Sequence, residues 1–334
     1  MKLTPLIRVA ATGAAIVLAA GGLAACSGGE PADNSPDDSN ATSSEPLRVA
    51  TLPVTSFLLP YLAQEEGLFE AEGITVELEV APGGGQAQLP LVVSGDYDLG
   101  VAGAGDILSL SQGSDLYAIA GAGGVYEGDV DVAQSVIITK DPDIQAPADL
   151  EGKTIGLNSI GSQTEAAVRV LIDEDGGDSS TTTFVQVPVQ NSLTAVSNSQ
   201  VDAAVTNEPF LTQARLEGGY TIVASNDEPF DGLPSSTYFA TKANAEARGD
   251  DISAFVRAMQ AAAKMANEDP ELVRQLVADN TETPADLLAE IEHFTEFAET
   301  TDVGTYEDFA QFMVDAGLIP SLPAQEDWLF VPTT

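Results

Sequence analysis

A single histidine and a single cysteine limit the chemistry open to the side chains of this 334-residue chain. Acyl-transfer sites need a nucleophile beside a base, most often His with Ser or Cys. His293 lies among glutamates, which is typical of a solvated surface histidine, and Cys26 lies near the N-terminus. No G-x-S-x-G nucleophile elbow is present in the sequence. The sequence therefore predicts no catalytic residues.

Cofactor and metal motifs are not found either. The segment Gly103-Ala104-Gly105 lacks the third glycine of the dinucleotide fingerprint, because Leu108 occupies that place. The cluster at 83–85 is not followed by Gly-Lys-Ser/Thr, so it is not a phosphate loop. His and Cys are too few for a metal cluster, and no D-x-D-x-D-G calcium loop occurs. We expect no cofactor and no metal.

The segment from Asp149 to Glu165 has the residue types of a binding loop. It predicts a short buried strand at Thr154–Leu157, a polar loop at 158–161 and then a helix start. The pair Ser162-x-x-Glu165 has the spacing of a helix capping box. A strand, a polar loop and a helix N-terminus together present backbone N–H groups to a ligand. We expect one half of a binding site here.

The elements that position such loops alternate between strand and helix in two successive blocks. In the first block we expect strands at 47–52, 74–80, 98–102 and 116–120, with helices at 60–66, 86–93 and 107–111. In the second we expect strands at 154–157, 183–187, 202–206 and 221–224, with helices at 164–173, 192–199 and 210–217. This alternation predicts an α/β fold of two lobes, each a mostly parallel sheet flanked by helices.

Two further β runs, at 135–140 and 237–241, are expected to be the crossover strands between the lobes. The chain after them has helical periodicity, as in Ile252, Phe255, Val256 and Met259. A helix beginning at Thr283-Pro284 is expected to bury Leu287, Leu288, Ile291 and Phe294 and to carry His293, and a third helix ends at Gly317. The predicted boundaries are 47–138 and 237–334 for lobe 1 and 139–236 for lobe 2.

The charge is strongly negative, with 12 Lys and Arg against 52 Asp and Glu, a formal net charge of −40. Proteins that bind nucleic acid need a basic footprint, so nucleic-acid binding is not expected. Attraction to anionic lipid headgroups is disfavoured for the same reason. A solvated acidic surface is the simplest interpretation.

The N-terminus has the pattern of a processing signal over residues 1–25. Lys2 and Arg8 precede an apolar stretch from Val9 to Leu23, and the segment ends in Leu-Ala-Ala-Cys26. This ending resembles the bacterial lipobox, in which the cysteine becomes the lipidated N-terminus; a plain secretory signal with an incidental cysteine is the alternative. Residues 26–46 are rich in Gly, Ser, Pro and Asp, which predicts a flexible tether. We expect a protein lipid-anchored to the outer face of the bacterial cell membrane.

Four phrases of the sequence resemble, in order, the substrate-binding proteins of ABC transporters of the sulfonate/nitrate/taurine/thiamine-precursor type (SsuA-like, periplasmic binding protein type 2). They are YLAQEEGLFEAEGITVEL at 61–78, LVVSGDYDLGVAG at 91–103, DLEGKTIGL at 149–157 and VDAAVTNEPF at 201–210. The resemblance covers about residues 47–320. It implies a two-lobed clamshell that closes on a small molecule and does not change it chemically. It also implies a monomer whose partners are an ABC permease and ATPase.

The positions that match the family's ligand loops follow the carboxyl ends of strands, where open α/β sheets place ligands. They are Thr55, Ser56, Phe57, Gly105 and Asp106 in lobe 1, and Asn158, Ser159, Gln163, Asn207 and Glu208 in lobe 2.

Each of these positions has a simpler explanation that stays open. Asp106 could cap its helix, Phe57 could belong to the core, and Glu208 could form a loop with Pro209. Ser162 is expected to cap its own helix, so Ser162→Ala should cost about 1 kcal/mol of stability. Asn158→Ala is expected to weaken ligand binding instead.

The charge of these loops indicates the ligand class. They contain no Lys or Arg, while Asp106 and Glu208 would oppose an anion by about 1–4 kcal/mol each at a few ångström. We therefore favour a nitrogenous compound such as a thiamine-precursor pyrimidine over a sulfonate or nitrate, which remains the alternative. An enzyme resembling thiamine-pyrimidine synthases, which rely on an internal His and a Cys-rich motif, and a partner of a membrane sensor kinase are the competing hypotheses.

Overall fold

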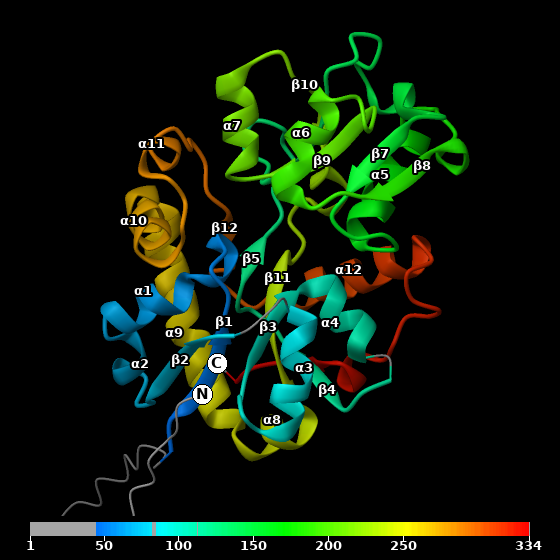
Figure 1. Ribbon diagram of the computed structural model, residues 1–334. Coiled ribbons are helices and arrows are strands. Elements are labelled where there is room, and N and C mark those ends of the chain that lie inside the picture. Colours follow the sequence, from blue (N-terminus) through cyan, green and yellow to red (C-terminus); the bar gives the residue numbers. More distant parts are fainter. Residues whose placement is uncertain (1–44, 82–84, 112, 334) are drawn as a thin grey trace, which may run out of the picture. The chain divides into compact units, whose positions relative to one another are not determined.

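The computed structural model describes residues 45–81, 85–111 and 113–333 (Figure 1). The predicted signal peptide, the lipobox at Cys26 and nearly all of the predicted tether lie outside these residues. Within the described part of the chain, no helix is long and apolar enough to cross a membrane.

The first lobe is built on a four-stranded sheet in the order β13-β4-β11-β3. Its strands are β3 (Gly100–Gly103), β4 (Leu116–Ile119), β11 (Ser236–Thr241) and β13 (Leu329–Phe330). Strand β11 runs antiparallel to β3 and β4, whereas β13 runs parallel to β4. A parallel pair, β1 (Leu47–Thr51) and β2 (Val76–Val80), joins this sheet through a bridge between Val49 and Leu99.

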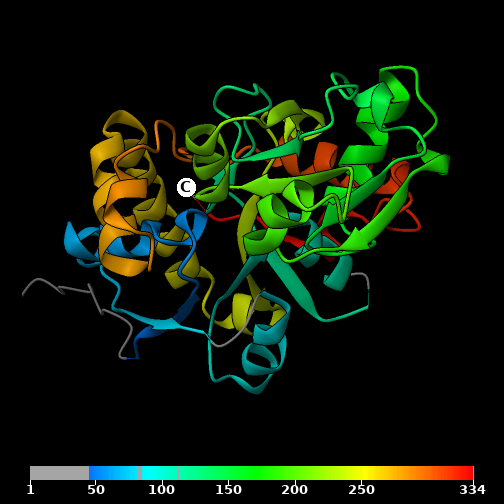
Figure 2. The ribbon, with the colours of Figure 1, turned by 45° about the horizontal axis from the view of Figure 1, so that its top comes forward.

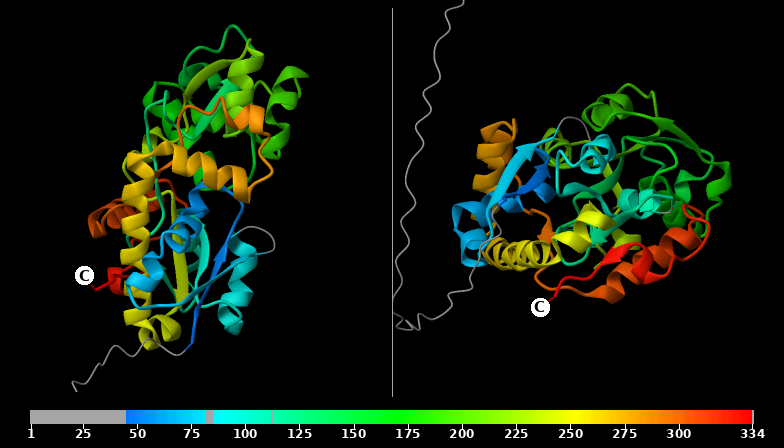
Figure 3. Two further views of the ribbon diagram at one scale, coloured as in Figure 1. Left: turned by 90° about the vertical axis from the view of Figure 1, so that its left-hand side faces the viewer. Right: turned by 90° about the horizontal axis from the view of Figure 1, so that it is seen from below.

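Helices cover this sheet on both faces, so that nearly all of β11 is buried. The helices of this lobe are α1 (Leu59–Glu65), α2 (Leu68–Ala71), α3 (Gly85–Ser94), α4 (Ala104–Ser111), α8 (Lys242–Ala247), α9 (Gly249–Glu268), α10 (Pro270–Asn280), α11 (Ala285–Leu288) and α12 (Val303–Asp315). The long helix α9 (yellow) runs along the lobe and contacts α1, α2 and α10 (Figures 2 and 3). The helices after β11 therefore pack against helices that precede the second lobe in the chain.

Aromatic side chains and an ion-pair network fix the tail in place. Phe255 of α9 stacks on Phe69 of α2 with ring centroids 5.6 Å apart. The Nη1 atom of Arg248 lies 3.2 Å from Oδ2 of Asp98, just before β3. The only tryptophan, Trp328, is buried at the edge of β13 and packs against Tyr306 of α12.

The second lobe is built on a five-stranded sheet in the order β10-β6-β9-β7-β8. Its strands are β6 (Ser135–Thr139), β7 (Thr154–Leu157), β8 (Thr183–Gln186), β9 (Ala203–Asn207) and β10 (Thr221–Ser225), and its helices are α5 (Gln163–Glu174), α6 (Ser192–Ser197) and α7 (Phe210–Glu217). Strand β7 pairs parallel with β8 and β9, while β6 pairs antiparallel with β9 and β10.

Two segments, which we call the connectors, link the lobes: residues 124–134 and 226–235. The first contains β5 (Gly124–Val125), which pairs with β12 (Glu296–Phe297). The connectors bond to each other, because the Tyr126 N–H donates to the Leu233 carbonyl (2.9 Å) and the Ser235 N–H to the Gly124 carbonyl (3.0 Å). Figure 1 shows β5 and β11 where the two lobes meet.

Two sequence predictions need correction. The sheets are mixed, because the runs at 135–140 and 237–241, placed as β6 and β11, run antiparallel to their neighbours. The helix from Pro284 ends at Leu288, so His293 is not helical but lies in an exposed irregular segment. The guanidinium of Arg274 accounts for this end, since it donates to the carbonyls of Leu288 and Ile291. The lobe boundaries stay a prediction.

Candidate functional site

A cavity of about 230 Å³ lies between the lobes and draws its walls from both lobes and both connectors. Its volume is slightly below the usual range for small-molecule pockets, so a compact solute would fill it. Its lining comprises Val54, Thr55, Ser56, Phe57, Tyr126, Gln134, Ser135, Gln163, Thr164, Asn207, Glu208, Asn226, Asp227, Phe230, Ser235, Ser236 and Thr295.

The first lobe supplies a short 3-10 turn, Thr55–Phe57, which follows β1. The turn is held from within, because the buried Thr51 hydroxyl donates to the Phe57 carbonyl (3.0 Å). Phe57 is partly buried against the core of the lobe and also lines the cavity. The two explanations of Phe57 are thus compatible. All three predicted residues of this turn border the cavity.

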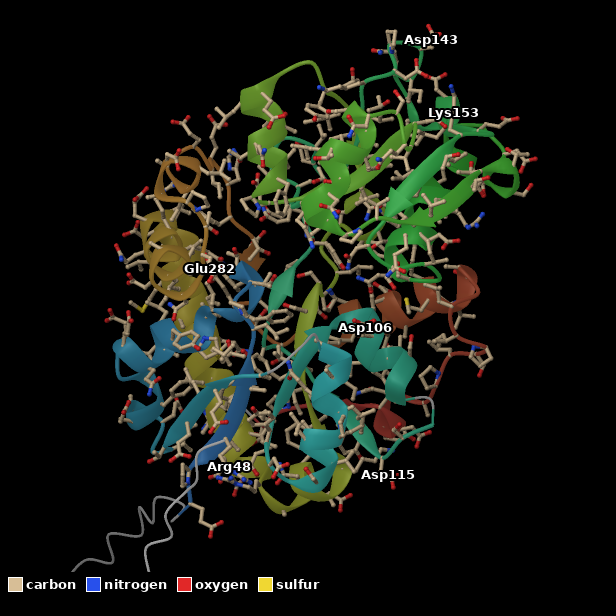
Figure 4. The ribbon with its side chains drawn as sticks, in the orientation of Figure 1. Arg48, Asp106, Asp115, Asp143, Lys153 and Glu282 are labelled. Atoms are coloured by element: carbon tan, nitrogen blue, oxygen red, sulfur yellow. The ribbon has the colours of Figure 1, made fainter. Side chains whose placement is uncertain are left out.

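The N-terminal end of α4 approaches the second lobe without lining the cavity. Gly105 is buried, and a Cβ atom there would collide with Oε1 of Gln163. The missing side chain therefore permits the close approach of α4 to α5. Asp106, labelled in Figure 4, is exposed and is not among the lining residues.

Gln163 is the predicted residue that the structure places most centrally. It is the first residue of α5, and its Nε2 donates to the Tyr126 hydroxyl of the first connector. Its Oε1 is buried and has no hydrogen-bond partner. Gln163 thus touches a connector through its amide nitrogen and α4 through its amide oxygen, which lies against Gly105.

The loop after β9 brings Asn207 and Glu208 to the cavity wall. The Glu208 carboxylate caps α7, because its oxygens accept from the Thr212 N–H (3.1 Å) and hydroxyl (3.0 Å). Burial raises the pKa of Glu208, which these hydrogen bonds oppose. Glu208 therefore both stabilises the loop before α7 and lines the cavity.

The loop before α5 departs from the prediction. Asn158 and Ser159 are exposed and do not line the cavity. Ser162 occupies the N-cap position, but its hydroxyl donates to the Ser159 carbonyl (2.9 Å) and makes no cap bond. Glu165 accepts from the Gly161 N–H instead of the Ser162 N–H. The predicted capping box is therefore wrong, because the loop folds back on the hydroxyl that would have capped the helix.

The connectors contribute a buried carboxylate that the sequence did not reveal. Asp227 is 2% exposed, and its Oδ2 accepts from the backbone N–H groups of Gln134 (3.1 Å) and Ser135 (3.0 Å). Burial raises the pKa of Asp227 to about 7, against the opposing effect of these two bonds. The carboxylate therefore fastens the second connector to the start of β6 at the cavity wall.

Tyr126 is the second connector residue missed from the sequence. Its ring stacks on Phe230 with centroids 5.0 Å apart, and Phe230 meets the edge of Phe312 of α12. Burial raises the pKa of the Tyr126 phenol, so it stays neutral and can donate or accept. The sequence around Tyr126 is rich in glycine (Gly121, Gly123, Gly124 and Gly128), which does not indicate which side chains turn inward.

The cavity offers hydrogen-bond acceptors in excess. The buried atoms Gln163 Oε1, Asn226 Oδ1 and Ser235 Oγ have no hydrogen-bond partner. The lining residues that the structure describes include no Lys, Arg or His. Over the same described residues, no group of His, Cys, Asp and Glu could hold a metal ion. Such an arrangement can bind a donor-rich molecule.

Comparison with known proteins gives a family and a fold. The family described as "NMT1/THI5 like" matches residues 54–272. No curated protein matches the chain in sequence.

Solved structures match nearly the whole folded body. The periplasmic aliphatic sulphonate binding protein SsuA from Escherichia coli has 21% identity and a TM-score of 0.68, covering 87% of this chain and 94% of its own. The alkanesulfonate-binding protein SsuA from Xanthomonas axonopodis pv. citri, bound to MOPS, has 18% identity and a TM-score of 0.65, covering 85% and 98%. A Candida albicans protein with the generic periplasmic binding protein fold has 16% identity and a TM-score of 0.62, covering 83% and 92%. The predicted two-lobed α/β periplasmic-binding-protein fold is thereby confirmed.

Proposed function

We propose that this chain, which belongs to the NMT1/THI5-like family, is the extracytoplasmic solute-binding component of an ABC importer. The observation that carries the proposal is the cavity between the lobes, walled by both lobes and both connectors. A ligand in such a place stabilises the closed arrangement of the lobes over the open one, and a permease can read that difference. The names of similar solved structures support the same role.

We propose further that the ligand is a compact nitrogenous compound such as a thiamine-precursor pyrimidine. Such compounds carry N–H donors for the unpaired acceptors on Gln163 and Asn226. The alternative is a sulfonate, which the names of the Escherichia coli and Xanthomonas proteins favour. A sulfonate would enter a cavity that lacks a basic side chain among its described residues and contains the carboxylates of Asp227 and Glu208.

A ligand screen tests both parts of this proposal. Small molecules that co-purify with the protein are identified by mass spectrometry, and pyrimidines, alkanesulfonates and nitrate are compared by thermal shift. A true ligand at 100 times its Kd adds about 2.7 kcal/mol to the free energy of unfolding. Stabilisation by alkanesulfonates alone would reject the nitrogenous ligand and keep the solute-binding role. If no ligand of any class bound, the solute-binding role itself would be rejected.

The remaining parts of the proposal concern anchoring and partners. We propose lipidation at Cys26, attachment to the outer face of the cell membrane by this lipid alone, and a monomer that delivers its ligand to a permease and ATPase. Mass spectrometry of the intact protein, with and without Cys26→Ala, would detect or exclude the lipid. A purified soluble body that turned over pyridoxal phosphate would favour the enzyme alternative, which the lack of a His or Cys in the described cavity lining opposes.

A further inference from the structure

We infer that the cavity selects a compact cation bearing N–H groups, such as an amidinium, guanidinium or primary ammonium, and that the carboxylate of Asp227 is its counter-charge. This inference rests on the proposed solute-binding function and narrows its ligand class. It follows from the kinds of atoms that the cavity leaves unpaired and from the charges that surround them.

The unpaired atoms define what the ligand must supply. Gln163 Oε1 and Asn226 Oδ1 are acceptors only, and each is buried without a partner. A buried acceptor left unpaired lowers stability, so a ligand that satisfies it gains affinity. A ligand that carries N–H donors therefore suits this cavity better than one that carries acceptors alone.

The second observation is the sign of the charges at the wall. Asp227 is nearly inaccessible to solvent yet borders the cavity, and its partners are two backbone N–H groups rather than a cation. Within the described part of the chain, the charged and titratable groups that act on Asp227 or line the same cavity include Glu127, Tyr126 and Glu208. None of these can carry a positive charge. An anion would face Asp227 and Glu208, whereas a cation would complete a charge pair.

Asp227 is a better counter-charge than Glu208. Burial raises the pKa of Glu208, and this rise is opposed by the hydrogen bonds from Thr212 to both carboxylate oxygens and by the charge of Arg215. Among the described residues, the carboxylate of Asp227 accepts from two backbone N–H groups and from no side-chain cation.

Binding of a cation should release the proton of the Asp227 carboxyl. In the empty protein the pKa of Asp227 is about 7, so the carboxyl is mostly protonated at pH 6. A bound cation stabilises the ionised form, and the proton leaves to solvent. Binding should release about 0.9 proton at pH 6 and about 0.1 proton at pH 8, as expected for one group with this pKa.

The experiment is isothermal titration calorimetry with defined probes on the soluble folded body. Benzamidine, methylguanidine and ethanolammonium represent cations, ethanesulfonate and nitrate represent anions, and 4-amino-5-hydroxymethylpyrimidine represents neutral donors. Each titration is run at pH 6 and pH 8 in two buffers of different ionisation enthalpy, which reports the number of protons released. We expect at least one cation to bind, with proton release at pH 6 and little at pH 8.

Two variants locate the effect. Asp227→Asn keeps acceptors for the two backbone N–H groups but cannot ionise, so it should weaken cation binding at pH 8 by about 30-fold or more and abolish proton release. Glu228→Gln removes the neighbouring exposed carboxylate, which does not line the cavity, and should change affinity less than about twofold. If Asp227→Asn does not fold, proton release by the wild-type protein still decides the question.

The outcomes separate the inference from the function beneath it. Binding of anions only, or of the neutral pyrimidine without proton release, overturns the inference and leaves the solute-binding function in place. Equal loss of affinity in Asp227→Asn and Glu228→Gln also overturns it. If no probe binds and no small molecule co-purifies, the proposed function fails together with the inference.

Discussion

The loop at 158–161 has the sequence pattern of a binding loop but lies outside the cavity, whereas the connector at 226–235 lacks that pattern but lines the cavity. The loop follows a strand and precedes a helix, which is the pattern typical of a binding loop, yet Asn158 and Ser159 are exposed outside the cavity. The connector has no such pattern, yet it brings Asn226, Asp227 and Ser235 to the cavity wall. A polar residue that packing removes from water can therefore mark a site where no local sequence pattern does.

The physical basis of this difference is the cost of burial. A buried polar group that makes no hydrogen bond lowers stability. Unpaired groups of this kind are therefore rare in native structures. The connectors hold a fully buried carboxylate and an unpaired amide oxygen side by side. The exposed loop satisfies its polar groups with water at no such cost. The next experiments test whether the connectors, rather than the loop tips, carry the site.

The largest expected effect is on the pH dependence of stability. Since burial raises the pKa of Asp227 from 3.8 to about 7, the folded protein keeps a proton between these values that the unfolded chain has released. The free energy of unfolding of the empty protein should therefore fall as pH rises from about 4 to about 7, by up to about 4 kcal/mol. Chemical denaturation across this range measures the loss.

Asp227→Asn is the control for this measurement, because the other carboxylates titrate equally in both proteins. The difference in stability between variant and wild type should grow in favour of the variant up to about pH 7 and then level off. A constant difference from pH 4 to pH 8 would contradict a raised pKa and would make Asp227 an ordinary exposed acid.

The next effect concerns the aromatic part of the first connector. Tyr126→Ala removes the stack on Phe230 and the bond to Gln163, and we expect a loss of about 3 kcal/mol in the free energy of unfolding. Tyr126→Phe keeps the ring and removes only the hydroxyl, so about 1 kcal/mol is expected. Equal losses in the two variants would show that the ring contributes little and that the hydrogen bond fixes the connector.

A smaller effect is expected where the lobes approach each other. Gly105→Val should push the Gln163 side chain out of place and weaken ligand binding by at least about tenfold, or about 1.4 kcal/mol. Gly103→Ala is the matched control, because a Cβ there would make only ordinary contacts, the nearest at 3.6 Å. Calorimetry with the ligand identified by the screen measures the affinity of both variants. Equal affinities would argue against a close approach of α4 to α5 in the ligand-bound protein.

The smallest effects belong to the loop before α5. The sequence alone predicted weaker binding for Asn158→Ala, but its exposed position outside the cavity now leads us to expect a change below about twofold. Ser162→Ala should cost only a few tenths of a kcal/mol, less than a capping residue would, because its hydroxyl bonds the Ser159 carbonyl. A tenfold loss of affinity in Asn158→Ala would restore the loop to the site.

The fold could be predicted largely because strand–helix alternation depends on local pattern. The strand at Thr154–Leu157 and the helix at Phe210–Glu217 have the bounds that periodicity predicted. The direction of β6 and β11 could not be predicted, because it depends on how the chain crosses twice between the lobes. The early end of the helix after Pro284 depends on Arg274, which is distant enough in sequence to leave no local sign.

The candidate site could be predicted only in part for the same reason. Thr55, Ser56, Phe57, Gln163, Asn207 and Glu208 follow strand ends and do line the cavity. Asp227 and Tyr126 owe their positions to contacts between two segments about a hundred residues apart, and no periodicity announces such contacts. Their role in binding a ligand remains a prediction, as it does for the residues found from sequence.

The position of the only tryptophan has a practical consequence for measuring affinity. Trp328 packs in the first lobe and does not line the cavity, so the native emission of the protein would respond weakly to a ligand. Residues 45–333 contain no cysteine, and the exposed Val54 lies on the cavity wall. A Val54→Cys variant of the folded body would therefore accept a single environment-sensitive dye, which makes this protein a suitable frame for a fluorescent sensor of whatever solute it binds.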